Sequence, residues 1–258
     1  MKLRKILTGF IFLLLPVITM AVLPHKNTSV LAAGRWYKIA VGKTGITRIT
    51  YADLQSLGIT PESLDVTRIR LFGNGPGMLP EANMAPRTDD LREVAVSVED
   101  GGDGHLDPAD YILFFGEGAD KWTYEGFNRF FSHQRNLYSD STYYFLNFDQ
   151  GQGQRVHHMP AITDPATGFS GRFDDYCLHE LDQLNLIKSG KEWYGELFDN
   201  TKTSWVFPFS FPNIDSLSNV RLRTSVAAHA STPSYFFISQ GGSKIDSLKV
   251  DSSDPAEY

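Results

Sequence analysis

The sequence predicts a mainly β protein, and three observations support that prediction. Aromatic residues make up 13% of the chain. The 22 glycines and 13 prolines are spread along the chain instead of forming runs. Short apolar or alternating segments recur between them, as in strands that are joined by tight turns. An all-helical bundle is therefore not expected.

The first 32 residues have the pattern of a secretory signal peptide, which we assign to residues 1–32. Three basic residues precede the mostly apolar run 6–15, and Ala21 and Ala32 mark two candidate cleavage positions. An N-terminal membrane anchor is the alternative, but Pro16 and later polar residues interrupt the run before it spans a bilayer. Export from the cytoplasm is therefore expected.

The mature chain is expected to be acidic. Cleavage after Ala32 would remove four of the 24 basic residues and none of the 30 acidic ones, which leaves a net charge of about −10. That charge disfavours binding to nucleic acid, so no nucleic-acid partner is expected, and divalent cations are better candidates. Cys177 is the single cysteine, so no disulfide can form within the chain and stability must come from the core.

Residues 34–150 are expected to form an N-terminal domain that is α+β or β-rich. Alternating residues at 36–41 and 46–49 flank a glycine-containing turn, which predicts a β-hairpin. Further strands are expected at 68–72, 91–98, 111–115 and 142–148.

One short helix is expected at Tyr51–Leu57. Thr50 is followed three residues later by Asp53, which resembles a capping box. Gly58 then supplies the left-handed residue that ends many helices.

A second domain, an incomplete β-sandwich or jelly roll, is expected at 169–258, after a linker at 151–168. A sandwich needs about seven strands, and the sequence offers about five. The strand-like segments are 169–181, 203–211, 220–228, 234–239 and 244–250.

The acidic loop that begins at Glu99 has the approximate spacing of a twelve-residue calcium loop. Glu99, Asp103, Asp107 and Asp110 would supply oxygen ligands, and Gly104 would make the sharp turn. Calcium is the one cofactor that the residues suggest. The favoured alternative is a β-connection in which Asp107 caps a helical turn that begins at the following proline.

No residue is assigned a catalytic or cofactor-binding role. Cys177 and His179 would share a face of a strand, but nothing nearby supplies an oxyanion hole, so Cys177 is interpreted as a buried structural residue. The adjacent His157 and His158 point in opposite directions in an extended chain and are interpreted as surface residues. Prolines after the glycines at 73–77 exclude a dinucleotide site.

Aromatic pairs could stack on sugar rings if they were exposed. Trp193 and Tyr194 are one such pair, but aromatic residues in strand-like segments usually belong to a core. The core interpretation is favoured for them.

A series of short segments carries a family resemblance. In chain order they are Gly34–Val41, Lys43–Ile46, Thr50–Leu54, Leu57–Ile59, Ile69–Gly75, Met78–Glu81, Asp89–Leu91, Asp110–Gly116, Asn136–Asp140, Tyr143–Leu146 and Gly190–Glu196. Together they resemble the opening of the type IX secretion system sortases, the PorU family of gingipain-like cysteine peptidases.

The resemblance implies a surface enzyme of a Gram-negative bacterium that removes C-terminal sorting domains from exported cargo and attaches the cargo to the cell surface. Family members continue into a caspase-like domain with the catalytic Cys and His, which nothing here matches, so Cys177 inherits no role. We expect this chain alone to lack enzyme activity. The implied partners are its own peptidase domain, an outer-membrane β-barrel protein and exported cargo. The alternative is an independent secreted binding or adhesion module.

Overall fold

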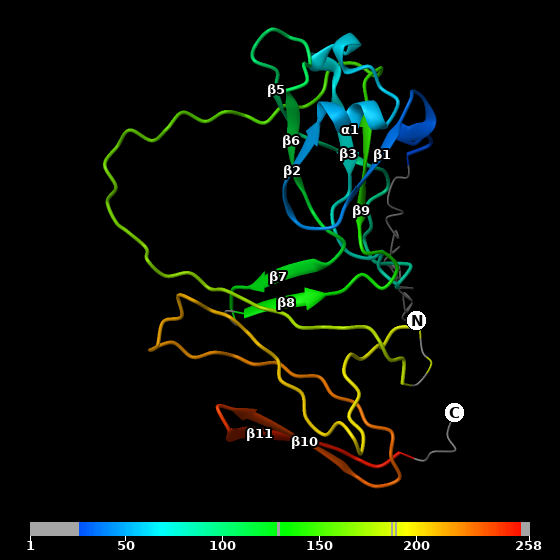
Figure 1. Cartoon of the computed structure of the whole chain (residues 1–258). Helices are drawn as coiled ribbons and strands as arrows, with labels where there is room; N and C mark the ends of the chain where they lie inside the picture. Colours follow the sequence, from blue (N-terminus) through cyan, green and yellow to red (C-terminus); the bar gives the residue numbers. More distant parts are fainter. Residues whose placement is uncertain (1–25, 128–129, 187, 189, 254–258) are drawn as a thin grey trace, which may run out of the picture. The chain divides into compact units, whose positions relative to one another are not determined.

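The computed structural model describes residues 26–253, except 128, 129, 187 and 189. Most of the expected signal peptide therefore lies outside the described residues. Within them, antiparallel strands dominate and a single α-helix is present, which confirms the prediction of a mainly β chain (Figure 1). No helix in this part of the chain is long and apolar enough to cross a membrane.

The contacts divide the chain into two compact units. The first unit contains residues up to Lys121 together with Tyr138–Pro160, and the second contains Trp122–Leu137 together with the residues from Ala161 onward. The hairpin that precedes Leu137 thus groups with the C-terminal segment. The expected domain boundaries stay predictions.

Two antiparallel sheets form the first unit. One has the strand order β1-β9-β3-β4 and the other β2-β6-β5. The strands are β1 (Tyr37–Val41), β2 (Gly45–Thr50), β3 (Arg70–Gly73), β4 (Arg92–Val94), β5 (Ser97–Glu99), β6 (Tyr111–Gly116) and β9 (Thr142–Asn147). Strands are present in all the predicted segments of this region, but the single strand predicted at 91–98 is wrong, because the chain passes from one sheet to the other between β4 and β5.

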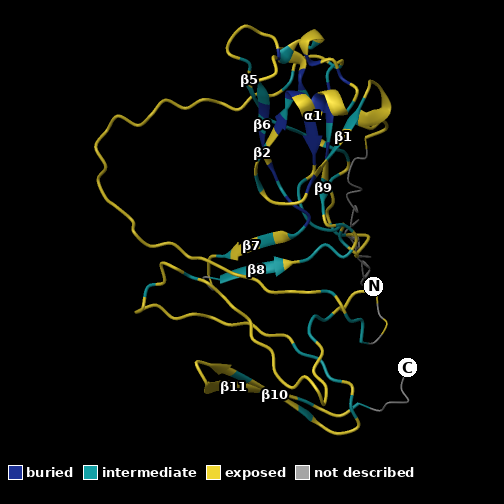
Figure 2. Ribbon diagram, viewed as in Figure 1, coloured by how far each residue is buried: buried dark blue, intermediate teal, exposed yellow. Residues whose placement is uncertain are grey.

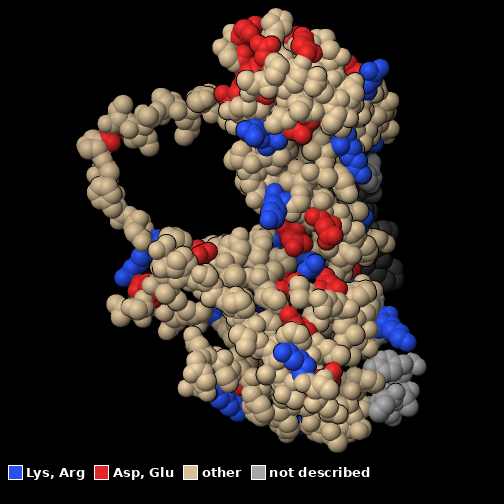
Figure 3. Space-filling view, viewed as in Figure 1, with Lys and Arg blue, Asp and Glu red and all other residues tan. Residues whose placement is uncertain are grey.

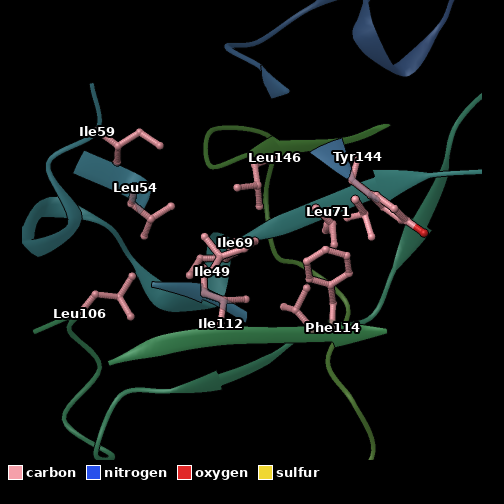
Figure 4. Packing of buried hydrophobic residues seen from close by; sticks show 12 residues of the cluster. Ile49, Leu54, Ile59, Ile69, Leu71, Leu106, Ile112, Phe114, Tyr144 and Leu146 are labelled. Atoms are coloured by element: carbon pink, nitrogen blue, oxygen red, sulfur yellow. The ribbon is translucent and has the colours of Figure 1, made fainter. Parts of the chain in front are cut away.

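The core lies between these two sheets. Phe114 of one sheet and Tyr144 of the other have ring centroids 5.1 Å apart, and both side chains are buried (Figure 4). Residues of both sheets and of the helix share one cluster, which consists of Val41, Ile49, Leu54, Ile59, Ile69, Leu71, Val96, Leu106, Ile112, Phe114, Tyr144 and Leu146. Their burial supplies the main stabilisation of this unit.

The predicted hairpin between β1 and β2 is wrong. Ile39 of β1 pairs with Tyr144, and Ile49 of β2 pairs with Ile112, so the two strands belong to different sheets. The intervening turn carries the chain from one sheet to the other. Alternation identified the strands but not their partners, because the partners lie far away in the sequence.

Helix α1 (Tyr51–Ser56) confirms the predicted capping box. The Thr50 hydroxyl accepts a hydrogen bond from the Asp53 N–H at 3.2 Å, and the Asp53 carboxylate accepts one from the Thr50 N–H at 2.8 Å. The Thr50 hydroxyl also donates to the Asp53 carboxylate at 2.6 Å, and this bond, with the one from the Thr50 N–H, lowers the pKa of Asp53. Gly58 follows with φ +76°, as its role as a helix stop requires. Three 3-10 turns complete the unit, at Val30–Ala32, Pro61–Ser63 and Val66–Arg68.

Residues 153–156 remain bound to the first unit. The Gly153 N–H donates to the Thr67 carbonyl at 3.0 Å, and the Val156 N–H donates to the Val96 carbonyl at 3.0 Å. A Cβ at Gly153 would collide with the Ile69 carbonyl, so this close approach requires glycine. The chain therefore leaves the first unit later than residue 151.

The second unit has little regular structure among its described residues. It contains two antiparallel pairs, β7 (Lys121–Glu125) with β8 (Phe130–Gln134) and β10 (Ser234–Gln240) with β11 (Ser243–Val250). The last two of the five predicted strand segments are thus strands. The described residues of the first three, 169–181, 203–211 and 220–228, form no strand.

The reason is visible in the burial of the second unit. Phe169 is 96% exposed, Val206 90% and Leu217 89%, and most of residues 161–250 are exposed or half-buried (Figure 2). Without a second apolar face to cover them, these segments bury too little surface to fix a ladder. The expectation of an incomplete second domain stays a prediction.

Candidate functional site

Around the loop between β5 and β6, acidic side chains accept hydrogen bonds from near neighbours in the sequence. Glu99 accepts a hydrogen bond from the Ser97 hydroxyl at 2.8 Å, and Asp103 accepts one from the His105 N–H at 2.9 Å. Acidic side chains gather over this end of the first unit (Figure 3). Nevertheless, no group of three or more His, Cys, Asp or Glu residues suited to a metal ion occurs among the described residues.

Asp110, and not Asp107, holds the turn at the end of this loop. The Asp110 carboxylate accepts the Asp107 N–H at 2.7 Å, and the Asp110 N–H donates to the Asp107 carbonyl at 2.9 Å. The expected turn is present, but its cap is supplied by the residue at the other end, as in the second half of a capping box. Calcium binding by Glu99, Asp103, Asp107 and Asp110 stays a prediction.

Cys177 is exposed, so its interpretation as a buried residue is wrong. The extended segment around it has no closed core to enter. Among the described residues, no hydrogen bond joins His179 to the Cys177 thiol. The His179 Nε2 atom lies 2.6 Å from the Glu196 carboxylate, and the His179 ring packs on Phe207 with centroids 4.9 Å apart. His157 and His158 are exposed, as expected.

An extended segment of the second unit, residues 174–182, contacts the β7–β8 hairpin with alternate side chains. The Tyr176 ring lies 4.1 Å from that of Trp122 and 4.5 Å from that of Phe131, measured between centroids. Side chains two residues apart in an extended chain share a face. The next members of this face are therefore expected to reach the hairpin as well.

The Glu180 and Asp182 side chains also reach this hairpin side, each beside a basic side chain. The Glu180 carboxylate lies 3.1 Å from Nδ1 of His133, and the Asp182 carboxylate lies 2.7 Å from Nε of Arg135. The Arg135 guanidinium also donates to the Glu180 carbonyl at 3.1 Å. Two acidic side chains thus face two basic side chains, each pair with a two-residue spacing.

A cavity of about 250 Å³ in the second unit includes both carboxylates in its lining. Glu192, Trp193 and Tyr194 form another part of the lining, together with Leu137, Lys191 and Ser225. Its wall is therefore rich in charged and aromatic groups.

Backbone hydrogen bonds fix the aromatic side of this cavity. Leu184 and Tyr194 exchange two N–H to carbonyl bonds, both of 2.8 Å. Burial raises the pKa of the Tyr194 phenol, and the neighbouring Glu192 carboxylate raises it further. Trp193 stays 43% exposed, so the core interpretation of this aromatic pair fits Tyr194 better than Trp193.

Sequence reasoning missed the acidic residues of this cavity. A usable signal was present, since His133 on β8 and Arg135 just after it match Glu180 and Asp182 on another segment in spacing and in opposite charge. The sequence did not show that these two segments meet.

Comparisons with known proteins gave one similarity of interest. No family model and no curated protein matched the chain. Among solved structures, the chain is similar to dimeric latent PorU from Porphyromonas gingivalis, with 30% sequence identity and a TM-score of 0.37. The match covers 51% of this chain and 11% of that chain. The present chain therefore matches only a small part of that protein.

Proposed function

We propose that this chain is the N-terminal, non-catalytic portion of a sortase-like surface protein of the type IX secretion system. The observation that carries the proposal is the ordered series of segments from Gly34–Val41 to Gly190–Glu196 that resembles the opening of the PorU family. Many separate segments in one order are more specific than any single motif. The cleavage of sorting signals and the attachment of cargo belong to the whole protein under this proposal.

The position of the segments in the fold fits a structural role. Gly34–Val41 contains β1, Asp110–Gly116 contains β6, and Tyr143–Leu146 lies within β9. Their inward side chains build the core of the first unit. Core side chains stabilise the fold. We therefore propose that this unit has a structural role, which is to support or dock a peptidase domain.

Location and partners provide a first test. The tagged protein, expressed in its own bacterium, should be found in the outer-membrane fraction and should co-purify with an outer-membrane β-barrel protein and with exported cargo. A Glu62→Gln variant, altered at an exposed residue of the first unit, serves as the matched control. Release of the protein into the medium without these partners would favour the independent secreted module instead.

A further inference from the structure

The charged cavity of the second unit supports an inference that goes beyond the proposed function. We propose that this cavity binds the guanidinium group of an arginine side chain presented by a peptide. Glu180, Asp182 and Glu192 supply the charge, and Trp193 supplies the stacking surface.

The charges of the lining favour a cation. Three carboxylates line the cavity, against the one ammonium group of Lys191. His133 and Arg135 contact two of the carboxylates from the hairpin side. The three carboxylates outnumber the cationic groups of Lys191 and Arg135 by one. A guest with one positive charge would neutralise this excess negative charge, whereas a phosphate or carboxylate guest would be repelled.

The geometry favours a planar, bidentate donor. Glu180 and Asp182 are two residues apart in an extended segment, so their side chains project on the same side at a separation of about 7 Å. The bonds to His133 and Arg135 hold them in place before a guest arrives. A guanidinium presents five N–H donors in a rigid fork and suits such a pair better than an ammonium does.

The aromatic wall of the cavity and the cavity volume also favour a guanidinium group. Trp193 is 43% exposed, which leaves ring surface for a guanidinium to stack on. A cavity of about 250 Å³ is smaller than the usual pocket for a drug-sized molecule and suits one long side chain. A neutral sugar could also stack on Trp193, but it would leave the net negative charge uncompensated.

The test measures binding of a fluorescein-labelled Gly-Arg-Gly-Arg-Gly peptide to the purified chain by anisotropy. Binding should weaken about tenfold when citrulline, which is uncharged and nearly isosteric, replaces both arginines. Glu192→Gln and Trp193→Leu should each weaken it by a similar factor, and added salt should weaken it in the parent protein. Glu62→Gln, an equivalent change in the first unit, should leave binding unchanged.

Each alternative outcome has a clear meaning. Equal binding of the citrulline peptide, or full binding by both Glu192→Gln and Trp193→Leu, would overturn the proposal. Binding of a neutral oligosaccharide in place of the arginine peptide, with loss in Trp193→Leu, would also overturn it. Thermal melts check that the variants are folded. The assay uses no sorting readout, so its failure is distinct from failure of the proposed function.

Discussion

Arg70 and Glu93 form a two-point ion pair between strands β3 and β4. Nε of Arg70 lies 3.1 Å from one Glu93 carboxylate oxygen, and Nη2 lies 2.6 Å from the other. Glu93 also accepts the Gln154 N–H at 2.9 Å. One carboxylate thus ties together two strands and the segment that leaves the first unit.

This pair predicts an acid-sensitive contribution to stability. Burial alone would raise the pKa of Glu93, but hydrogen bonds from Arg70 and Gln154 and the nearby positive charges together lower it. Because the folded-state pKa is depressed, the contribution is present above the ordinary glutamate pKa and is lost as pH falls through the folded value. Glu93→Gln should cost about 2 kcal/mol at pH 7. Urea melts should show this cost shrinking toward pH 3, and a cost that does not change with pH would contradict the account.

Substitution of Asn147 should cause a large loss of stability. Its side chain is fully buried and donates to the Arg35 carbonyl at 3.1 Å, while it accepts the N–H groups of Asp149 and Gln150 at 3.2 and 3.0 Å. Asn147→Leu would remove these three hydrogen bonds to the backbone, at a cost of about 2 to 4 kcal/mol. Chemical denaturation measures this loss of unfolding free energy. A loss below about 0.5 kcal/mol would show that water replaces the hydrogen bonds of the amide.

The Asp107 to Asp110 turn predicts different effects for its two aspartates. Asp110→Ala should destabilise the chain by about 1 kcal/mol, because its carboxylate caps the Asp107 N–H. Asp107→Ala should cost less, since no hydrogen bond to its carboxylate occurs among the described residues. Thermal unfolding of both variants without calcium compares them directly. Equal losses of stability in the two variants would contradict the assignment of the cap to Asp110.

Calcium is tested in the same proteins. We expect at most weak binding, in the range of extracellular modules, because the Glu99, Asp103 and Asp110 carboxylates already accept hydrogen bonds from near neighbours in the sequence. If calcium binds, millimolar ion should raise the melting temperature of the wild type but not of the Asp103→Ala, Asp107→Ala double variant. The absence of any shift in the wild type would remove the metal hypothesis.

The surroundings of Cys177 predict that the chain alone has no peptidase activity. The thiol is exposed, and no hydrogen bond joins it to His179, whose Nε2 lies 2.6 Å from Glu196, among the described residues; a nucleophilic thiol needs a base within reach. The purified chain should not cleave cargo peptides, and Cys177→Ala should change nothing. Turnover that this substitution abolishes would contradict the interpretation.

Local features of the first unit could be read from the sequence. Thr50, Asp53 and Gly58 lie within nine residues of one another, and their local chemistry marks where the helix begins and ends, while packing of Leu54 in the core stabilises it. The strands followed from their apolar patterns in the same way. The pairing of Ile39 with Tyr144 could not be inferred, because alternation specifies which face of a strand is buried and not which strand lies beside it.

The candidate site shows the same limit. Glu180 and Asp182 are ordinary surface residues in the sequence, and they become part of a cavity only where segment 174–182 meets the β7–β8 hairpin. The predicted strands before residue 228 in the second unit were wrong for a related reason. Apolar alternation predicts a strand, but a ladder forms only where a neighbouring strand and a second apolar layer are available.

The proposed role of this chain is that of the N-terminal, non-catalytic portion of a type IX sortase-like protein. The most direct test is an in-frame deletion of codons 34–258 in the bacterium of origin, followed by intact-mass measurement of exported cargo proteins. The account predicts that cargo retains its C-terminal sorting domain in the deletion strain, while a Cys177→Ala strain processes it normally. Normal removal of the sorting domain and normal surface attachment in the deletion strain would contradict the account.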